Sequence, residues 1–151
     1  MHKRVRFPVL LLAVIAGFGI FHFIGGLFTY KGTLIYEIHI FKFGYDNFIH
    51  LVASFLYTII GYSLLEPGLN DNIKKNRFYF GFLLFIFGFG IAAFGEIVEL
   101  IGVLQVGSPG VGDYFNNAFD LVFNAIGALV ASLLVVRHHW KKDLIKVRQS
   151  S

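Results

Sequence analysis

Three pairs of polar residues stand at helical spacing inside otherwise apolar stretches of this sequence. They are Asp46 with His50, Glu96 with Glu99, and Asp120 with Asn124. Residues three or four apart share one face of a helix, so each pair predicts a polar patch on an apolar helix. Carboxylates and an imidazole are ligands suited to a divalent cation such as zinc, manganese or magnesium. Without a metal, close carboxylates would share a proton and could serve in general acid/base catalysis.

Two other interpretations of these pairs stay open. A polar network would lock helices together through interhelical hydrogen bonds, which average under about 1 kcal/mol each in membranes. Alternatively, the acids and amides would recognise a polar ligand such as a lipid headgroup. The combination of Glu-x-x-Glu and Asp-x-x-x-His is not a specific metal signature, and the Glu-x-x-His motif of di-iron bundles is absent from the sequence.

The composition indicates what kind of chain must position these residues. Of the 151 residues, 56% are hydrophobic and nineteen are phenylalanine, and the mean hydropathy is +0.70. Such a chain is too apolar for a water-soluble domain of this length and predicts a polytopic membrane protein. The absence of cysteine excludes disulfide bonds and thiolate metal sites.

Four apolar segments are long enough to cross a bilayer, which takes about 20 residues. They cover residues 7–30, 45–65, 78–104 and 115–136. The first follows the basic stretch MHKRVR, and we interpret it as a retained helix because its apolar run exceeds the core of a signal peptide. The predicted fold is an all-α membrane protein with four transmembrane helices in a compact bundle. Residues 1–151 form one membrane domain, with residues 137–151 as a cytoplasmic tail.

Basic residues predict the orientation. Three groups precede the first span, separate the second from the third, and follow the fourth. They are Lys3, Arg4 and Arg6; Lys74, Lys75 and Arg77; and Arg137, Lys141, Lys142, Lys146 and Arg148. By the positive-inside rule, both termini of a multi-pass cell-membrane protein are then cytoplasmic. We expect membrane lipids as partners and no nucleic acid, because the sequence has neither a basic groove nor base-stacking motifs.

Counting residues along the spans predicts the depth of the polar side chains. A helix rises about 1.5 Å per residue, so Glu96 and Glu99 lie about 28 to 33 Å outward from Arg77. The pairs that begin the second and fourth spans, and His22 in the first, reach the same external depth. Charges inside a membrane normally face the bundle interior or water. We therefore predict an outward-opening polar cavity.

The connections and the glycines give weaker expectations. The largely apolar segment 31–44 would lie at the interface or pack across the outer face of the bundle. Pro67 and Gly68 would end the second helix, and Asp113 or Asn116 would cap the fourth. Small residues are expected where helices approach closely. They are Gly17, Gly19, Gly25, Gly26, Gly81, Gly88, Gly90, Gly95, Gly127, Ala128 and Ala131.

Three stretches resemble a known family. YDNFIHLVASFLYTIIGYSLL is similar to the Asp-x-x-x-His helix of VanZ-like membrane proteins, FGEIVEL to their glutamate helix, and NNAFDLVFNAIGALVASLL to their final Asp-x-x-x-Asn-x-x-Gly-Ala helix. The order agrees over residues 45–134. Tyr45 and Asp46 before the histidine, with Glu-x-x-Glu in the next motif, resemble the YjdF-type branch of uncharacterised inner-membrane proteins. The arginine often found before the last helix is missing, and the family's Trp/Gln-rich loop is reduced to residues 112–113 and 116–117.

The resemblance carries over to Asp46, His50, Glu96, Glu99, Asp120 and Asn124, with Gly127 as a helix-contact position, and it implies an envelope-related role. The catalytic candidates are Asp46, His50, Glu96, Glu99 and Asp120; the substrate-binding candidates are Asn124, Asp113 and Asn117; the metal-ligand candidates are His50, Glu96, Glu99 and Asp120. The cofactor implied by those ligands is a divalent metal ion. Whether the chain is an enzyme stays open, because the biochemical activity of the family is not established.

Two functions of different classes follow. The first is a VanZ-like protein that binds or modifies an envelope lipid or lipid-linked molecule at a polar site in the outer leaflet. The second is a non-catalytic subunit of a larger membrane complex, in which the Phe-rich surface packs against other membrane subunits or a second copy of the chain. Transport is a third, although four spans leave little room for alternating access unless the chain oligomerises.

Overall fold

The structure is a computed structural model that describes residues 9–40, 43–106 and 114–150. Long helices dominate it: α1 (Val9–Leu27), α2 (Tyr45–Leu65), α4 (Arg77–Val106) and α5 (Tyr114–Ser150). Each carries a segment apolar and long enough to cross a membrane, namely Val9–Leu27, Tyr45–Gly68, Arg77–Gly102 and Phe115–Lys141. The predicted all-α architecture with four transmembrane helices is confirmed.

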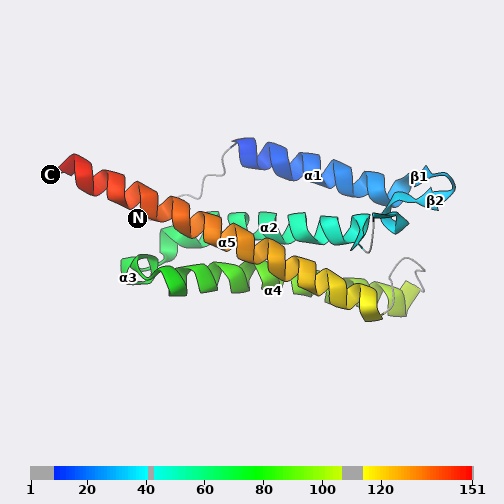
Figure 1. Cartoon of the computed structure of the whole chain (residues 1–151). Helices are drawn as coiled ribbons and strands as arrows, with labels where there is room; N and C mark the ends of the chain where they lie inside the picture. Colours follow the sequence, from blue (N-terminus) through cyan, green and yellow to red (C-terminus); the bar gives the residue numbers. More distant parts are fainter. Residues whose placement is uncertain (1–8, 41–42, 107–113, 151) are drawn as a thin grey trace.

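Helices α2, α4 and α5 form the core of the bundle, with α5 crossing over the other two (Figure 1). Their buried apolar contacts at one end centre on Phe80, Leu84 and Val135. The start of α1 and the end of α5 lie at the same end of the bundle (Figure 1). That arrangement agrees with an even number of spans.

Two glycines allow the core helices to approach each other. A Cβ atom at Gly127 of α5 would overlap the backbone carbonyl oxygen of Leu51 and the hydroxyl of Ser54 on α2. At Gly88 of α4, a Cβ atom would overlap the side chain of Thr58 on α2. Small residues permit this close contact, which is how helices associate where burial from water supplies no driving force.

The expectation of close packing is wrong for several other glycines. Added Cβ atoms at Gly17, Gly19, Gly90 and Gly95 would meet nothing within 4 Å. Gly17 and Gly19 lack neighbours because most of α1 lies outside the core, and Gly25 is the one residue of this helix that is buried. The α1 helix runs beside α2 and meets the rest of the protein near its end at Leu27 (Figure 1).

The segment between α1 and α2 forms two small hairpins rather than a helix. Strand β1 (Thr29–Tyr30) pairs with β2 (Thr33–Leu34), and β3 (His39–Ile40) pairs with β4 (Phe43–Gly44). Lys31 and Gly32 join the first two strands with positive φ angles of 53° and 84°. A two-residue turn with both φ angles positive matches the twist of the strands it connects.

Between the hairpins, the 3-10 turn η1 (Ile35–Glu37) directs Tyr36 onto the bundle. The Tyr36 ring lies beside Gly25 of α1 and makes edge contacts with the rings of His22 and Tyr45. The Tyr36 hydroxyl hydrogen-bonds to Nδ1 of His22, and the Tyr45 hydroxyl donates to the Phe21 carbonyl over 2.7 Å. The segment therefore packs against α1 and the start of α2, which is one of the two arrangements expected for it.

Replacing Tyr36 by phenylalanine should lower the free energy of unfolding by about 1 kcal/mol, the usual contribution of one hydrogen bond. Burial, with the negative charge of Asp46 second, raises the pKa of Tyr36 above the ordinary 10.0. A raised pKa means that the fold favours the neutral phenol. Its contribution is complete below pH 10.0 and is lost as the pH rises above that value.

Thermal unfolding in detergent at neutral and alkaline pH measures this effect. The Tyr36→Phe variant should lose part of the alkaline destabilisation that the parent shows. Tyr30→Phe is the matched control, since that side chain is 61% exposed. Identical pH dependence in parent and Tyr36→Phe would contradict the assignment.

The connection between α2 and α4 begins just before Pro67 and Gly68, which were expected to end the second helix. Helix α2 ends at Leu65, and the 3-10 turn η2 (Glu66–Gly68) contains Pro67. The short α3 helix (Asp71–Lys75) follows. Lys74 pairs with Asp71 at 3.0 Å and with Glu66 at 3.7 Å, and the hydrogen bond that Lys74 donates to Asp71 raises the pKa of Lys74.

The expectation that Asn116 caps the last helix is wrong. Helix α5 begins at Tyr114, so Asn116 lies within its first turn. Its side chain donates to Asp120 on the same helix and to Asp46 on α2. Asp113, the other expected cap and a substrate-binding candidate, lies outside the described residues.

Candidate functional site

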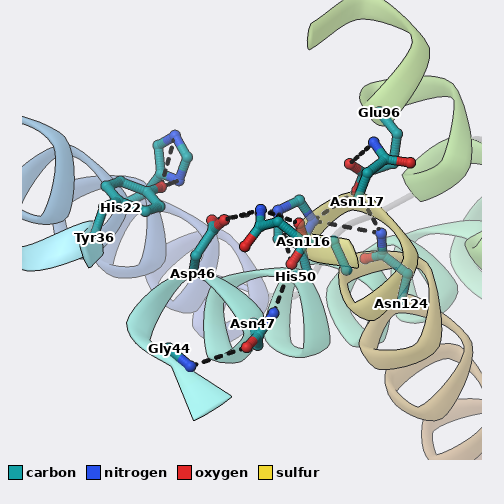
Figure 2. Close-up of polar contacts among 11 residues, drawn as sticks. His22, Tyr36, Gly44, Asp46, Asn47, His50, Glu96, Asn116, Asn117 and Asn124 are labelled. Carbon is teal, nitrogen blue, oxygen red and sulfur yellow. Dashed lines mark hydrogen bonds and ion pairs between the residues drawn. The ribbon is translucent and has the colours of Figure 1, made fainter. Parts of the chain in front are cut away.

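The three core helices bring their polar pairs together at the bundle end where α2 begins (Figure 2). Asp46 and His50 come from the first two turns of α2, Glu96 from α4, and Asp120 and Asn124 from α5. Relative exposures of 5% for Glu96, 2% for Asp120 and 1% for Asn124 show that these polar groups are buried. We call these five residues, with Glu99, the carboxylate cluster.

His50 is the centre of this cluster, and its two ring nitrogens face different carboxylates. Nδ1 lies 2.9 Å from Oε1 of Glu96, which is hydrogen-bond distance. Nε2 lies 3.4 Å from Oδ1 of Asp46 and 4.0 Å from Oδ1 of Asp120. An Nδ1–H that donates to Glu96 leaves the Nε2 lone pair directed at the two aspartates.

Amide side chains hold the carboxylates in place. Asn47 Nδ2 donates to Asp120 Oδ1 over 2.7 Å, and Asn116 Nδ2 donates to Asp120 Oδ2 over 2.8 Å. Asn124 Nδ2 donates to Glu96 Oε1 over 2.8 Å, while Asn117 Nδ2 lies 3.4 Å from Glu96 Oε2. Buried polar groups need such partners, so these amides fix the orientation of both carboxylates.

Asn47 also connects the cluster to the start of its helix. Its Oδ1 accepts a hydrogen bond of 2.9 Å from the Gly44 backbone N–H, which precedes α2. The same side chain donates to Asp120. The beginning of α2 and the first turns of α5 are therefore joined through one buried amide.

Carboxylates in the cluster outnumber the cationic side chains that pair with them. Within the described ranges, His50 is the one cationic side chain that forms an ion pair with Asp46, Glu96 or Asp120. Among the same residues, Oδ1 of Asn124 is buried and has no hydrogen-bond partner. Its amide adjoins both Glu96 and His50, so this unpartnered acceptor belongs to the interior of the cluster (Figure 2). Buried carboxylates at membrane depth need a compensating cation or protons.

Two groups of side chains could hold a metal ion. They are Asp46, His50 and Asp120, and His50, Glu96 and Glu99, and the ligand atoms within each group lie within 4.8 Å of one another. The groups share His50 but use it differently, since Glu96 already makes a direct hydrogen bond to Nδ1. On the Nε2 side the separations are wider, at 3.4 Å to Asp46 and 4.0 Å to Asp120.

Several predicted residues have a different place from the one expected. His22 lies at the expected end of α1, yet it is exposed and contacts Tyr36 rather than the cluster (Figure 2). Glu99 is exposed, although its partner Glu96 is buried. Asn117 lies beside the cluster, with its Nδ2 3.4 Å from Oε2 of Glu96.

Sequence reasoning missed the role of Asn47 and assigned Asn116 to capping. The roles of both amides could have been predicted from one feature of the sequence. Each amide lies within four residues of an aspartate or histidine near the end of an apolar span. Asn47 is adjacent to Asp46, and Asn116 is four residues before Asp120. A buried carboxylate requires donors, so neighbouring amides are natural suppliers.

Comparison with known proteins identifies one family. The family model described as Predicted membrane protein (DUF2238) matches residues 1–141. No curated protein and no solved structure matches the chain. The match covers all four membrane segments and every residue of the carboxylate cluster.

Proposed function

Since the chain belongs to the Predicted membrane protein (DUF2238) family, we propose that its carboxylate cluster binds a divalent transition-metal ion and recognises or modifies a polar lipid or lipid-linked molecule. The observation that carries this proposal is the set of buried carboxylates around His50, with the unpartnered Oδ1 of Asn124 beside it. A purely structural network is expected to pair its buried polar groups, so the unpartnered acceptor and the excess of carboxylates over the one imidazole favour a bound cation.

The proposed ligands are Nε2 of His50 and the Oδ1 atoms of Asp46 and Asp120. Two ligand atoms of a tetrahedral zinc ion, each about 2.0 Å from the metal, lie about 3.3 Å apart. The separations of 3.4 Å and 4.0 Å from Nε2 are close to that spacing and too long for strong hydrogen bonds. A mixed set of nitrogen and oxygen ligands favours zinc or manganese over magnesium and calcium, which prefer oxygen alone.

Glu96 has a positioning role in this arrangement. Metal-ligating histidines almost always donate their other ring N–H to a carboxylate or carbonyl, which fixes the tautomer and the ring orientation. The 2.9 Å contact between Nδ1 of His50 and Oε1 of Glu96 has this form. Asn124 holds the same oxygen of Glu96, so the support extends from α4 to α5.

Chemistry at this position would act on a polar group at the membrane surface. A bound divalent cation would supply positive charge that polarises a carbonyl or phosphoryl oxygen. The chain's own Asp46 is the least buried ligand, with 27% of its side chain exposed, and so faces the direction from which a substrate could enter. Glu99, one turn from Glu96 and exposed, would accept or deliver a proton in this proposal.

The depth of the cluster favours a lipid-related substrate. Glu96 is nineteen residues beyond Arg77 on one continuous helix, which corresponds to about 28 Å. That distance is nearly the thickness of the hydrocarbon core, so the cluster is expected at headgroup level. The positive-inside rule predicts the outer leaflet, and the resemblance to VanZ-like proteins of the YjdF type agrees with an envelope role.

Metal removal tests this proposal. Protein purified in mild detergent should contain one divalent metal ion per chain by elemental analysis, and a chelator should remove it. Adding back the metal at about 100 times its dissociation constant should raise the free energy of unfolding by about 2.7 kcal/mol. Thermal unfolding with zinc, manganese and magnesium added separately would rank the ions, and magnesium should stabilise least.

Native mass spectrometry of the same samples tests the substrate class. The metal-loaded protein should retain a lipid or lipid-linked molecule that the chelated protein releases. Metal binding without any lipid would leave a metal site and remove the lipid part of the proposal. Chelator-insensitive stability with no bound metal would contradict the metal site itself.

A further inference from the structure

A second polar feature lies at the opposite end of the bundle from the carboxylate cluster. A pocket of about 260 Å³ is lined by Arg77 at the start of α4 and by five residues of α5: Leu133, Val136, Arg137, Trp140 and Lys141. Arg77 and Arg137 are separated along the helices from Glu96 and Asp120 by about 25 to 28 Å. The pocket therefore sits at the other headgroup level of the same bilayer.

Three cationic side chains line this pocket, and no ion pair with a carboxylate is found for them in the part of the chain that the structure describes. Among the described residues, Lys74 is the lysine that forms ion pairs, with Glu66 and Asp71. None of the ion pairs found there involves Arg77, Arg137 or Lys141. The Arg77 guanidinium stacks on the Trp140 ring, with Cζ 3.7 Å from the ring centroid. Stacking occupies the face of a guanidinium and leaves its N–H groups in the plane free to donate to an anion.

Trp140 adds a donor. Its Nε1 is buried and has no hydrogen-bond partner within the described residues. A buried donor without an acceptor costs free energy, so it favours an occupant that supplies oxygen atoms. Three positive charges and an unused N–H together select an anion with several oxygens, and a phosphate group has this character.

Leu133 and Val136 indicate that the anion is attached to an apolar body. Both lie on α5 on the membrane side of Arg137, and Val136 packs against the buried core of Phe80, Leu84 and Val135. We propose that this pocket binds the phosphate headgroup of an anionic membrane lipid, with the cations around the phosphate and the two aliphatic side chains beneath its glycerol and acyl region. The site is independent of the carboxylate cluster and of the function proposed for it.

The single tryptophan of the chain makes this site directly observable, because all tryptophan emission comes from Trp140. Protein in neutral detergent micelles would be titrated with phosphatidylglycerol carrying brominated acyl chains, which quench nearby indole emission. We expect saturable quenching, and brominated phosphatidylcholine should quench weakly and without saturation. Each basic residue near a membrane surface contributes about 1 kcal/mol to attraction of anionic lipid.

Arg137→Gln and Lys141→Gln should therefore each weaken the apparent affinity about fivefold, and the double variant about thirtyfold. Lys75→Gln is the matched control, since it removes an exposed charge that does not line the pocket, and it should change the affinity little. All variants would be compared as monodisperse, folded protein by size-exclusion chromatography.

Three results would overturn the proposal. Equal quenching by the two lipids would show lipid contact without headgroup selection. An unchanged affinity in the double variant would remove the pocket as the site. Inorganic phosphate that displaces the brominated lipid at low concentration would identify a soluble phosphate compound as the occupant in place of a lipid.

Discussion

Alanine in place of His50 should abolish divalent metal binding, because it removes the one nitrogen ligand shared by both candidate metal groups. Neither remaining set would then contain an imidazole, and zinc binds mixed nitrogen and oxygen sites more strongly than carboxylates alone. Isothermal titration of chelator-treated protein with zinc and manganese measures the loss. Size-exclusion chromatography would establish that the variant is still folded.

Glutamine at position 96 should have a smaller and informative effect. Its side-chain oxygen can still accept a hydrogen bond from His50 or Asn124, while the negative charge is removed. Loss of a carboxylate that orients a metal-ligating histidine typically weakens metal affinity 10- to 100-fold. The same titration should therefore show metal binding that is weakened but present.

Glu99→Gln is the matched control, with the same change one turn along the same helix. If Asp46, His50 and Asp120 are the ligands, Glu99→Gln should leave metal affinity nearly unchanged, since Glu99 is exposed. Loss of binding in Glu99→Gln, with Asp120→Asn still binding normally, would move the metal to the group of His50, Glu96 and Glu99. Normal binding in His50→Ala would refute both arrangements.

Valine in place of Gly127 is expected to destabilise the whole bundle. The added side chain would collide with the Leu51 carbonyl oxygen, which is backbone and cannot rotate away as a side chain can. Overpacking a close contact costs about 1–3 kcal/mol, and the backbone collision places this variant near the upper figure. In a chain of this length, that loss corresponds to a decrease in Tm of about 10 °C.

The effect of Gly127→Val should reach the cluster. Leu51 directly follows His50, and Gly127 lies three residues after Asn124 on α5. Separating these helices would move the His50 ring relative to Asp120, so metal affinity should fall together with Tm. Thermal unfolding and metal titration on the same sample measure both.

Gly90→Val provides the control for that experiment. A Cβ atom at Gly90 meets nothing within 4 Å, and valine is slightly more favourable than glycine within a helix. The Gly90→Val variant should therefore match or slightly exceed the parent in Tm. Equal losses in the two variants would mean that glycine itself, rather than the α2–α5 contact, matters.

The sequence alone was sufficient to predict the membrane architecture and the pairing of polar residues along each helix. Both depend on local properties. An apolar run near 20 residues long is sufficient to indicate a span, and the 3.6-residue repeat places Asp46 with His50, and Asp120 with Asn124, on common faces. Counting along α4 from Arg77 also placed Glu96 at the end where those pairs lie.

Only the tertiary structure decided which of these faces meet. His22 has the predicted depth but contacts Tyr36, because α1 packs near its end at Leu27 and leaves most of its length outside the core. Asn47 points to Asp120 although it lies about 100° around the helix from Asp46. Neither fact is encoded in helical spacing.

The packing of the helices also decided which glycines make contacts and which carboxylates each ring nitrogen of His50 faces. Gly127 and Gly90 are indistinguishable as helix glycines, yet only the first lies against a neighbouring backbone. The assignment of Nδ1 of His50 to Glu96, and of Nε2 to Asp46 and Asp120, requires the relative rotation of three helices. Spacing along a chain determines what one helix can present, whereas the contacts between segments far apart in sequence determine which presented groups come within bonding distance.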